Sequence, residues 1–188
     1  MAYAFEFDKL VQAAGVLLMT TEPRRMSRLR LLKLLYLADR ESIRQTGFPI
    51  TGDAAYAMEN GPVLTRAYDC IKGIDYYSKD WRRFFRDSGR WDVELNEDPG
   101  VQLLSRGDID TLRQAAAHFA ERDDWELVEF THTLPEWQAH QPAVGSSERI
   151  PEREILEAVG LAEYADEILA DARAYARIDE LRRAMAHE

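Results

Sequence analysis

The stretch that decides the fold reads Arg28-Leu-Arg-Leu-Leu-Lys-Leu-Leu-Tyr-Leu-Ala-Asp-Arg-Glu-Ser-Ile43. Two sets of residues recur in it at helical spacing and lie side by side on a helix, namely Leu29, Leu32, Tyr36 and Ile43, and Leu31, Leu35, Ala38 and Ser42. A helix that is apolar over most of its circumference belongs inside a protein. The stretch therefore predicts a buried central helix over about residues 28–45.

Both ends of this helix carry a local signal. Ser27 is the predicted N-cap, because its hydroxyl can accept a hydrogen bond from an amide of the first turn. Gly47 and Pro49 end the helix. Lys33 and Asp39 interrupt the apolar belt, so each of these charged groups needs a partner or a route to water.

Composition limits the class of protein. A chain of 188 residues, with 46% hydrophobic and 31% charged residues, suits one globular domain, or one domain with a helical appendage. The net charge of −10 argues against indiscriminate nucleic-acid binding. Cys70 is the single cysteine, which excludes an internal disulfide. Lys33 splits the longest apolar run, and Glu6 and Asp8 replace the basic and apolar start of a signal peptide, so we expect a cytoplasmic protein with no membrane partner.

Further segments complete the predicted fold. Helices are expected at residues 7–19, from Pro62, after the capping box Ser105-Arg-Gly-Asp108, after Asp123 or Asp124, from Pro151 to Gly160, and at 161–185. Strands are expected near 54–60 and 91–95. The fold class is mainly α (α+β), a compact helical domain with a small β-sheet or hairpin and a C-terminal helix. The polar segment Gln138–Arg149 is the predicted linker between a domain at 1–150 and a C-terminal helical extension at 151–188 packed on it.

Several motifs follow one another in a characteristic order. They are Leu32-Lys-Leu-Leu-Tyr-Leu-Ala-Asp39, Gly47-Phe-Pro-Ile-Thr-Gly-Asp53, Gly61-Pro-Val63 followed by Tyr68, Leu104-Ser105, and Leu127 through Thr131-His132 to Pro135-Glu136-Trp137. Over roughly residues 6–160 the chain thereby resembles the Panacea family, an antitoxin domain also described as SocA-like. The final helix lies outside this resemblance.

The resemblance implies an antitoxin of a two-gene toxin–antitoxin system, which neutralises a cognate toxin by direct protein–protein binding. Such genes often sit on phages or other mobile elements, and the toxin is expected from the adjacent gene. Toxins paired with such domains include relatives of alarmone synthetases and other inhibitors of translation. The motif residues are then expected to be structural, namely Leu32, Lys33, Leu35, Tyr36, Asp39, Gly47, Gly61, Pro62, Tyr68, His132 and Trp137.

No catalytic arrangement stands out in the sequence. Cys70 has no histidine near it in sequence, and no phosphate-binding glycine loop, nucleophile elbow or zinc-finger spacing occurs. Lys33, Tyr36 and Asp39 are interpreted as buried polar side chains with hydrogen-bond or ion-pair partners rather than as catalytic residues. We therefore expect no enzyme activity and no cofactor.

The four histidines His118, His132, His140 and His187 are scattered. His132, Glu136 and His140 are spaced four apart, which on a helix would align three metal ligands. Pro135 interrupts that run, so a structural role for His132, packed near Trp137, is favoured over a metal site.

The segment from Tyr76 to Trp91 interleaves aromatic and basic residues. Arginine and aromatic side chains are enriched in protein-interface hot spots, and single-stranded nucleic acid also stacks on them. The alternative is a helix whose Trp81, Phe84 and Phe85 face the core, and we favour it for those three residues. The predicted partner-binding residues are Tyr76, Tyr77, Arg82, Arg83, Arg86 and Arg90.

Two other charged regions leave alternatives open. The basic cluster Arg24, Arg25, Arg28 and Arg30 is either a solvated helix entrance or a weak nucleic-acid patch. The acidic C-terminal helix is a solvated face, a surface for a basic toxin, or a site of pairing with a second copy through Ile168, Ala172 and Tyr175. Besides the antitoxin, the sequence leaves two other functions, a nucleic-acid-binding regulator and an adaptor that delivers a bound protein to a protease.

Overall fold

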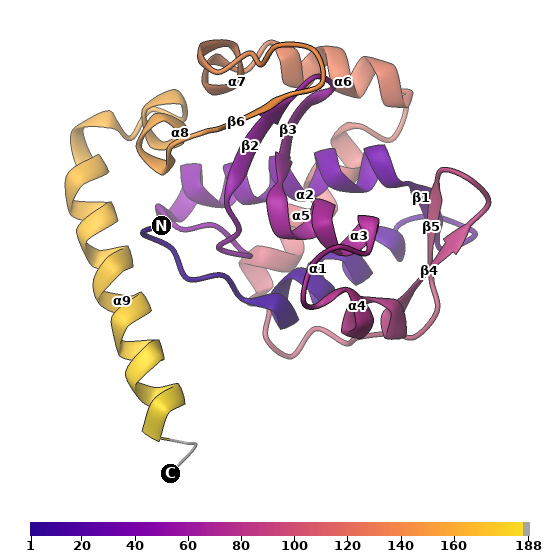
Figure 1. Ribbon diagram of the computed structural model, residues 1–188, viewed down its shortest axis with the longest axis horizontal. Helices are drawn as coiled ribbons and strands as arrows, with labels where there is room; N and C mark the ends of the chain where they lie inside the picture. Colours follow the sequence, from indigo (N-terminus) through magenta and orange to yellow (C-terminus); the bar gives the residue numbers. More distant parts are fainter. Residues whose placement is uncertain (186–188) are drawn as a thin grey trace.

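The computed structural model describes residues 1–185. The helix α2 (Arg28–Thr46) lies at its centre (Figure 1). Leu31, Leu35 and Tyr36 are at most 1% exposed. The Ser27 hydroxyl accepts a hydrogen bond of 3.0 Å from the amide of Arg30, and Gly47 ends the helix in the left-handed conformation. The predicted central helix and both of its ends are confirmed.

The helices that contact α2 include α1 (Phe7–Leu18), α5 (Arg106–His118), α6 (Asp124–His132) and α8 (Glu152–Ala158). Leu10 and Leu17 of α1, Leu112 of α5 and Leu127 of α6 are fully buried. The capping box predicted at Ser105 and Asp108 is present, and Asp123 caps α6. The fold is mainly α, as predicted.

Two antiparallel sheets of three strands flank this helical core within residues 1–185. The first sheet has the order β1 (Arg25–Ser27), β5 (Asp92–Leu95), β4 (Phe85–Ser88), with Met26 opposite Val93. The second has the order β3 (Gly61–Leu64), β2 (Ala55–Met58), β6 (Ser147–Arg149), with Tyr56 opposite Val63 and Arg149. The two strands predicted near 54–60 and 91–95 are confirmed, and each lies in a different sheet.

Two local predictions were wrong. Pro62 does not start a helix, because it lies in β3 opposite Ala57, and α3 (Thr65–Lys72) begins after that strand. A proline is tolerated there because β3 is at the edge of its sheet. The segment 138–149 is not purely a linker, since its last three residues form β6. All three are exposed and polar, so the alternation of apolar and polar residues that predicts a strand is absent.

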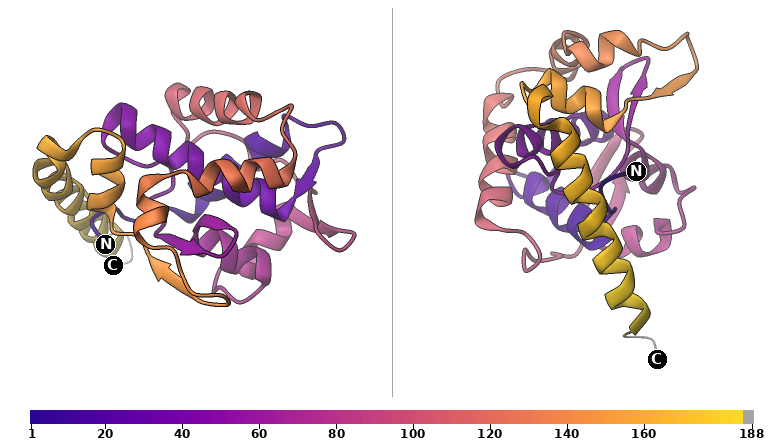
Figure 2. Two further views of the ribbon diagram at one scale, coloured as in Figure 1. Left: turned by 90° about the horizontal axis from the view of Figure 1, so that it is seen from above. Right: turned by 90° about the vertical axis from the view of Figure 1, so that its left-hand side faces the viewer.

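The C-terminal part continues through α7 (Pro135–Ala139), α8, a 3₁₀ turn η1 (Ala162–Tyr164) and α9 (Ala165–Met185). Ala165, Leu169 and Ala172 of α9 are buried against the rest of the protein. The apolar side chains of its second half are exposed, namely Ile178, Leu181 and Met185. Figures 1 and 2 show this half projecting beyond the body of the molecule.

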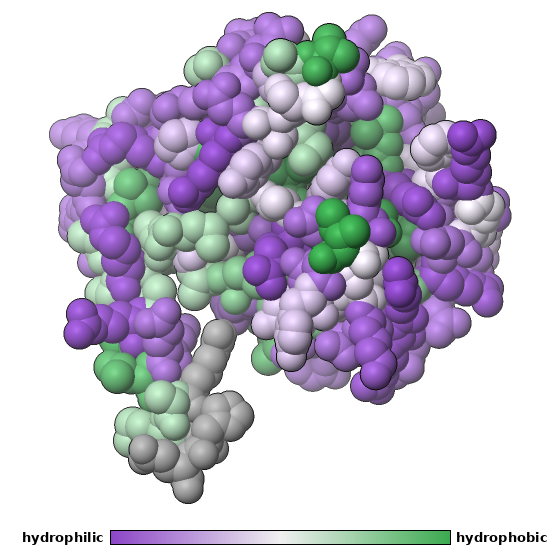
Figure 3. All heavy atoms as spheres, in the orientation of Figure 1, coloured by the Kyte–Doolittle hydropathy of each residue, from purple (hydrophilic) through white to green (hydrophobic). Residues whose placement is uncertain are grey.

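Within residues 1–185, none of the helices combines the length and the apolar character that a membrane crossing requires. On the face drawn in Figure 3, hydrophilic side chains predominate and the apolar ones form small, separate patches.

Candidate functional site

The residues of the sequence motifs meet inside the protein, around α2. Lys33 is fully buried, and its Nζ atom donates a hydrogen bond of 2.8 Å to the carbonyl oxygen of Pro62. Burial lowers the pKa of Lys33 to about 7. Gly61 has a φ of 90°, and a Cβ atom there would overlap the Thr131 hydroxyl and lie 3.1 Å from Lys33 Nζ. The β2–β3 turn is thus seated directly on α2 and α6.

A buried carboxylate connects α7 to α2. Glu136 accepts hydrogen bonds from the Tyr36 hydroxyl at 2.7 Å and from Arg40 Nε at 2.6 Å. The Glu136 side chain is fully buried and that of Arg40 is 17% exposed. Burial and the neighbouring Glu136 carboxylate raise the pKa of Tyr36. Because a buried carboxylate must be paired, these contacts fix the position of α7.

Two further carboxylates hold the loop before β2. Asp39 accepts hydrogen bonds from the amides of Ile50 and Thr51, each 3.1 Å long, and from the Thr51 hydroxyl at 2.6 Å. Burial raises the pKa of Asp39 to about 7. Asp53 accepts hydrogen bonds from the first-turn amides of α3, and burial raises its pKa to about 6. Each carboxylate therefore accepts hydrogen bonds from backbone amides in a loop or a first helical turn, where regular secondary structure supplies no acceptor.

His132 lies against Trp137, with the ring centroids 4.0 Å apart and the planes 11° from parallel. The indole of Trp137 donates a hydrogen bond of 3.1 Å to the carbonyl oxygen of Met58, which links α7 to the β2–β3 turn. Burial lowers the pKa of His132. This geometry agrees with the structural role predicted for His132.

The spacing of His132, Glu136 and His140 does not produce a metal site. Within residues 1–185, no group of three or more His, Cys, Asp or Glu side chains is arranged to hold a metal ion. His140 instead lies between Glu148 and Glu154, at 2.9 and 2.8 Å, and the hydrogen bond to Glu148 raises its pKa. His187 lies outside the described residues.

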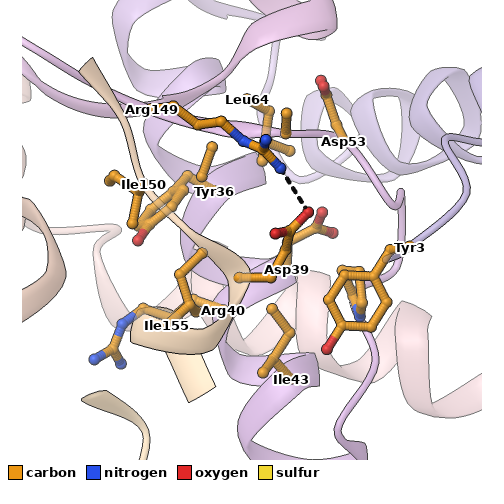
Figure 4. A pocket seen from close by; sticks show the side chains of 14 residues that line it. Tyr3, Tyr36, Asp39, Arg40, Ile43, Asp53, Leu64, Arg149, Ile150 and Ile155 are labelled. Carbon is orange, nitrogen blue, oxygen red and sulfur yellow. Dashed lines mark hydrogen bonds and ion pairs between the residues drawn. The ribbon is translucent and has the colours of Figure 1, made fainter. Parts of the chain in front are cut away.

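Next to this network is a small cavity, of about 20 Å³, between α2, the N-terminal segment and the start of α8. Figure 4 shows Tyr3, Tyr36 and Asp39 among the side chains around it. The Tyr3 hydroxyl donates a hydrogen bond of 2.7 Å to the carbonyl oxygen of Gly47. The volume admits a single water molecule. The motif residues therefore build a rigid interior and present no substrate-sized cleft at this place.

Arg40 was not predicted to belong to this interior network, and Thr131 was named only as part of a sequence motif. Arg40 lies four residues after Tyr36, hence on the same face of α2, and that spacing was the available signal. Thr131 lies beside Gly61, and no local pattern indicates a contact over 70 residues of sequence.

The predicted partner-binding residues are two tyrosines and four arginines, and they differ in exposure. The ring of Tyr77 stacks on Phe7 of α1, with centroids 4.4 Å apart, whereas Tyr76 is 87% exposed. Of the three residues expected to face the core from one helix, Trp81 and Phe85 are buried and Phe84 is half-buried. The helix α4 (Ser78–Phe84) is shorter than expected, because Phe85 begins the strand β4. The four arginines are all exposed, namely Arg82, Arg83, Arg86 and Arg90.

The surroundings of these arginines differ. Arg83 pairs with Glu97 at 2.8 Å and Arg86 pairs with Glu94 at 2.6 Å. The Arg90 guanidinium lies 4.8 Å from the centroid of the Trp91 ring. Arg82 has no acidic partner among the described residues.

The first sheet joins two basic segments that are far apart in sequence. Residues 24–30 and 79–90 together carry nine basic and two acidic groups. Strand β1 from the first segment and β4 from the second lie on either side of β5, and Arg28 pairs with Asp87 at 2.8 Å. Arg30 turns away and pairs with Asp124 of α6. In Figure 1 this sheet lies at the opposite end of the molecule from α9. We call the arginines on and near the sheet the basic sheet surface, namely Arg25, Arg28, Arg82, Arg83, Arg86 and Arg90.

The fold and its interior network define a helical domain with a hydrogen-bonded interior and a charged outer surface. The profile of one protein family, described as Antitoxin SocA-like, Panacea domain, matches residues 31–138, which run from α2 to α7. Since this match covers more than half of the chain, the protein belongs to the SocA-like Panacea family of antitoxin domains. No curated protein and no solved structure matches the chain.

Proposed function

We propose that this protein is the antitoxin of a toxin–antitoxin pair and that it neutralises its cognate toxin by direct, stoichiometric binding in the cytoplasm. The observation that carries the proposal is the match of residues 31–138 to an antitoxin family. In this proposal the toxin is encoded by the adjacent gene, on a phage or another mobile element. The protein itself performs no catalysis and uses no cofactor.

The interior network supports this proposal through its physical consequence. Lys33, Tyr36 and Asp39 each bond to a partner inside the protein and are at most 3% exposed. A surface carried on such a fixed interior loses little conformational freedom on binding, which favours affinity. A stable complex would bury at least a standard interface, about 1,600 Å² in total.

We also propose that residues 1–150 form the antitoxin domain and that 151–188 are a helical extension packed on it. In support, Ile155 and Leu156 of α8 are buried, and the ring centroid of Tyr175 lies 5.9 Å from that of Phe48. Ile168 and Ala172, considered above for pairing with a second copy, pack within the molecule. Any self-association of this helix would therefore use the exposed Ile178, Leu181 and Met185.

Co-expression tests the proposed function. The product of the adjacent gene is expressed alone and together with this protein, and growth is measured. We expect arrest in the first case and growth in the second. A product that is harmless alone, or that still arrests growth when this protein is abundant, would show that the proposal is wrong.

The same cells separate inhibition from delivery to a protease. If the protein acts only by binding, the half-life of the toxin stays constant or increases when the protein is present. A shortened half-life that depends on a cellular protease would assign the adaptor function instead.

A further inference from the structure

We infer that the basic sheet surface is the toxin-binding face, and that it receives an acidic segment of the partner with one large apolar side chain in the pocket beneath Arg82 and Arg86. This inference rests on the proposed function and specifies the partner's chemistry. It follows from the pocket, from the charges around it and from the exposed aromatic side chains in the same stretch of chain.

The pocket lies between α3, α4 and the first sheet and has a volume of about 210 Å³. Its floor is apolar and consists of Ile71, Trp81, Phe85 and Val93. Trp81 and Phe85 pack on each other, with ring centroids 4.2 Å apart, so the floor is fixed before a partner arrives. An apolar side chain that enters a preformed pocket is the usual anchor of a protein interface.

The charged residues that line the pocket are Arg82, Arg86 and Asp87, and the carboxylate of Asp87 already pairs with Arg28. Arg82 has no acidic partner among residues 1–185, and it lies against Gly73, where a Cβ atom would overlap its guanidinium. Arg86 is 60% exposed, and its ion pair with Glu94 lies at the surface, where such pairs contribute little to stability. An incoming carboxylate can therefore bind Arg82 directly. It can also replace Glu94 at Arg86, because little stabilisation is lost with that surface pair. Arginine binds carboxylates in a bidentate geometry.

The wider charge distribution favours an acidic partner. Even when β5 and the residues up to Glu97 are included, the segments 24–30 and 79–97 carry nine basic against five acidic groups, in a protein of net charge −10. A basic region on an acidic protein orients a partner of opposite local charge during encounter. Residues 150–188, which include α9 at the opposite end in Figure 1, carry ten acidic and five basic groups and would repel the same partner.

Two exposed aromatic side chains lie in the same stretch of chain as Arg82 and Arg86. Trp91 is 65% exposed with the Arg90 guanidinium over its ring, and Tyr76 is 87% exposed. Tryptophan, tyrosine and arginine are the residue types that dominate interface hot spots. Their occurrence within residues 76–91 supports this stretch as part of the binding surface.

A protein segment fits this surface better than a nucleic acid does. A nucleic acid carries a phosphate at every nucleotide, so its successive phosphates would meet the carboxylates of Asp87, Glu94 and Glu97, whereas a protein segment can place a single carboxylate at Arg82. The pocket lined by the buried Trp81 and Phe85 suits one side chain and offers no row of exposed rings on which successive bases could stack.

The experiment compares the wild-type protein with Arg82→Glu, with Arg82→Glu combined with Arg86→Glu, and with a control that combines Arg106→Glu and Arg113→Glu. The control residues are exposed on α5 and have no ion pair among the described residues. Arg82→Glu breaks no ion pair found there either, so its folding is expected to be unaffected, and thermal unfolding verifies this. The probes are a short fluorescent peptide with one tryptophan between glutamates, the same peptide with lysines, and single-stranded oligothymidylate.

We expect the acidic peptide to bind the wild type and the control, more weakly at high salt, and to bind the Arg82 and Arg86 variants at least about tenfold more weakly. No binding of the acidic peptide at low salt, or equal losses in the α5 control, would overturn the inference. Tighter binding of oligothymidylate than of the acidic peptide would assign the face to nucleic acid instead.

The same four proteins in the co-expression assay separate this inference from the proposed function. If the wild type neutralises the toxin and the double variant of Arg82 and Arg86 does not, both stand. If the double variant neutralises as well as the wild type, the binding face is wrong and the antitoxin function stands. If the wild type fails, the antitoxin function is wrong and the peptide measurement decides on the surface.

Discussion

The Nζ atom of Lys33 lies 2.8 Å from the carbonyl oxygen of Pro62, inside the protein and across 29 residues of sequence. This contact holds the β2–β3 turn on the central helix. It also removes an amine from water, because Lys33 is fully buried, and burial lowers its pKa to about 7.

The buried amine makes stability depend on pH. Between the folded pKa of about 7 and the unfolded value near 10.5, the unfolded chain binds one more proton at Lys33 than the folded protein, so its contribution to stability increases with pH and is lost as pH falls through 7. We therefore expect the stability of the wild type relative to Lys33→Met to rise by about 1.4 kcal/mol for each pH unit from pH ~7 to ~9.

Urea unfolding of both proteins across this range measures the difference. Other titrating groups, such as Asp39 and Cys70, are present in both proteins and cancel. A constant difference would mean that the Lys33 side chain reaches water.

Removal of one partner from the Arg40–Glu136 pair should be costly. Arg40→Met leaves the fully buried Glu136 carboxylate with the Tyr36 hydroxyl as its remaining bond, so we expect a loss of about 3 kcal/mol in the free energy of unfolding. Tyr36→Phe removes one hydrogen bond and should cost about 1 kcal/mol.

Arg44→Met is the matched control, because Arg44 pairs with Glu41 at the surface, and a change within about 0.5 kcal/mol is expected there. Equal effects at Arg40 and Arg44 would contradict the fixed position of α7.

Gly61 should tolerate a methyl group poorly. Gly61→Ala introduces both an unfavourable positive φ and an overlap with the Thr131 hydroxyl, whereas Gly89→Ala introduces a positive φ with no atom within 4 Å. We expect Gly89→Ala to cost about 1 kcal/mol and Gly61→Ala distinctly more. Thr131→Ala should restore part of the stability of Gly61→Ala, as measured by thermal unfolding. Equal costs at the two glycines would mean that the turn is not seated on α6.

Two leucines test how the C-terminal extension is attached. Leu156 of α8 is fully buried, and Leu181 of α9 is 58% exposed. Leu156→Ala should cost about 2–5 kcal/mol, and Leu181→Ala about 0.5 kcal/mol or less. Chemical unfolding of the two variants measures both values. A large loss at Leu181 would show that another surface covers the end of α9.

The central helix was predictable because its signal is local. The apolar spacing from Leu29 to Ile43, the hydroxyl of Ser27 and the conformation of Gly47 all act within one segment. Strand β6 was not predictable, because its three exposed residues become a strand only through pairing with β2. The same applies to β1, which joins the first sheet across more than 60 residues of sequence.

The candidate site shows the same division. Tyr36, His132 and Trp137 were predicted from the sequence but Arg40 was not, because its spacing after Tyr36 indicates a shared helix face and not its distant partner Glu136. The basic segments at 24–30 and 76–91 were predicted as separate clusters. Only the strand order β1-β5-β4 unites them into one surface.

The most direct measurement of the central claim is a titration of the purified toxin, the product of the adjacent gene, with the purified protein. Stoichiometric neutralisation predicts that toxin activity falls linearly with the molar ratio, reaches zero at a fixed equivalence point and is accompanied by a complex that contains both chains. Complete inactivation by a small fraction of an equivalent, or full toxin activity in the presence of excess protein, would contradict it.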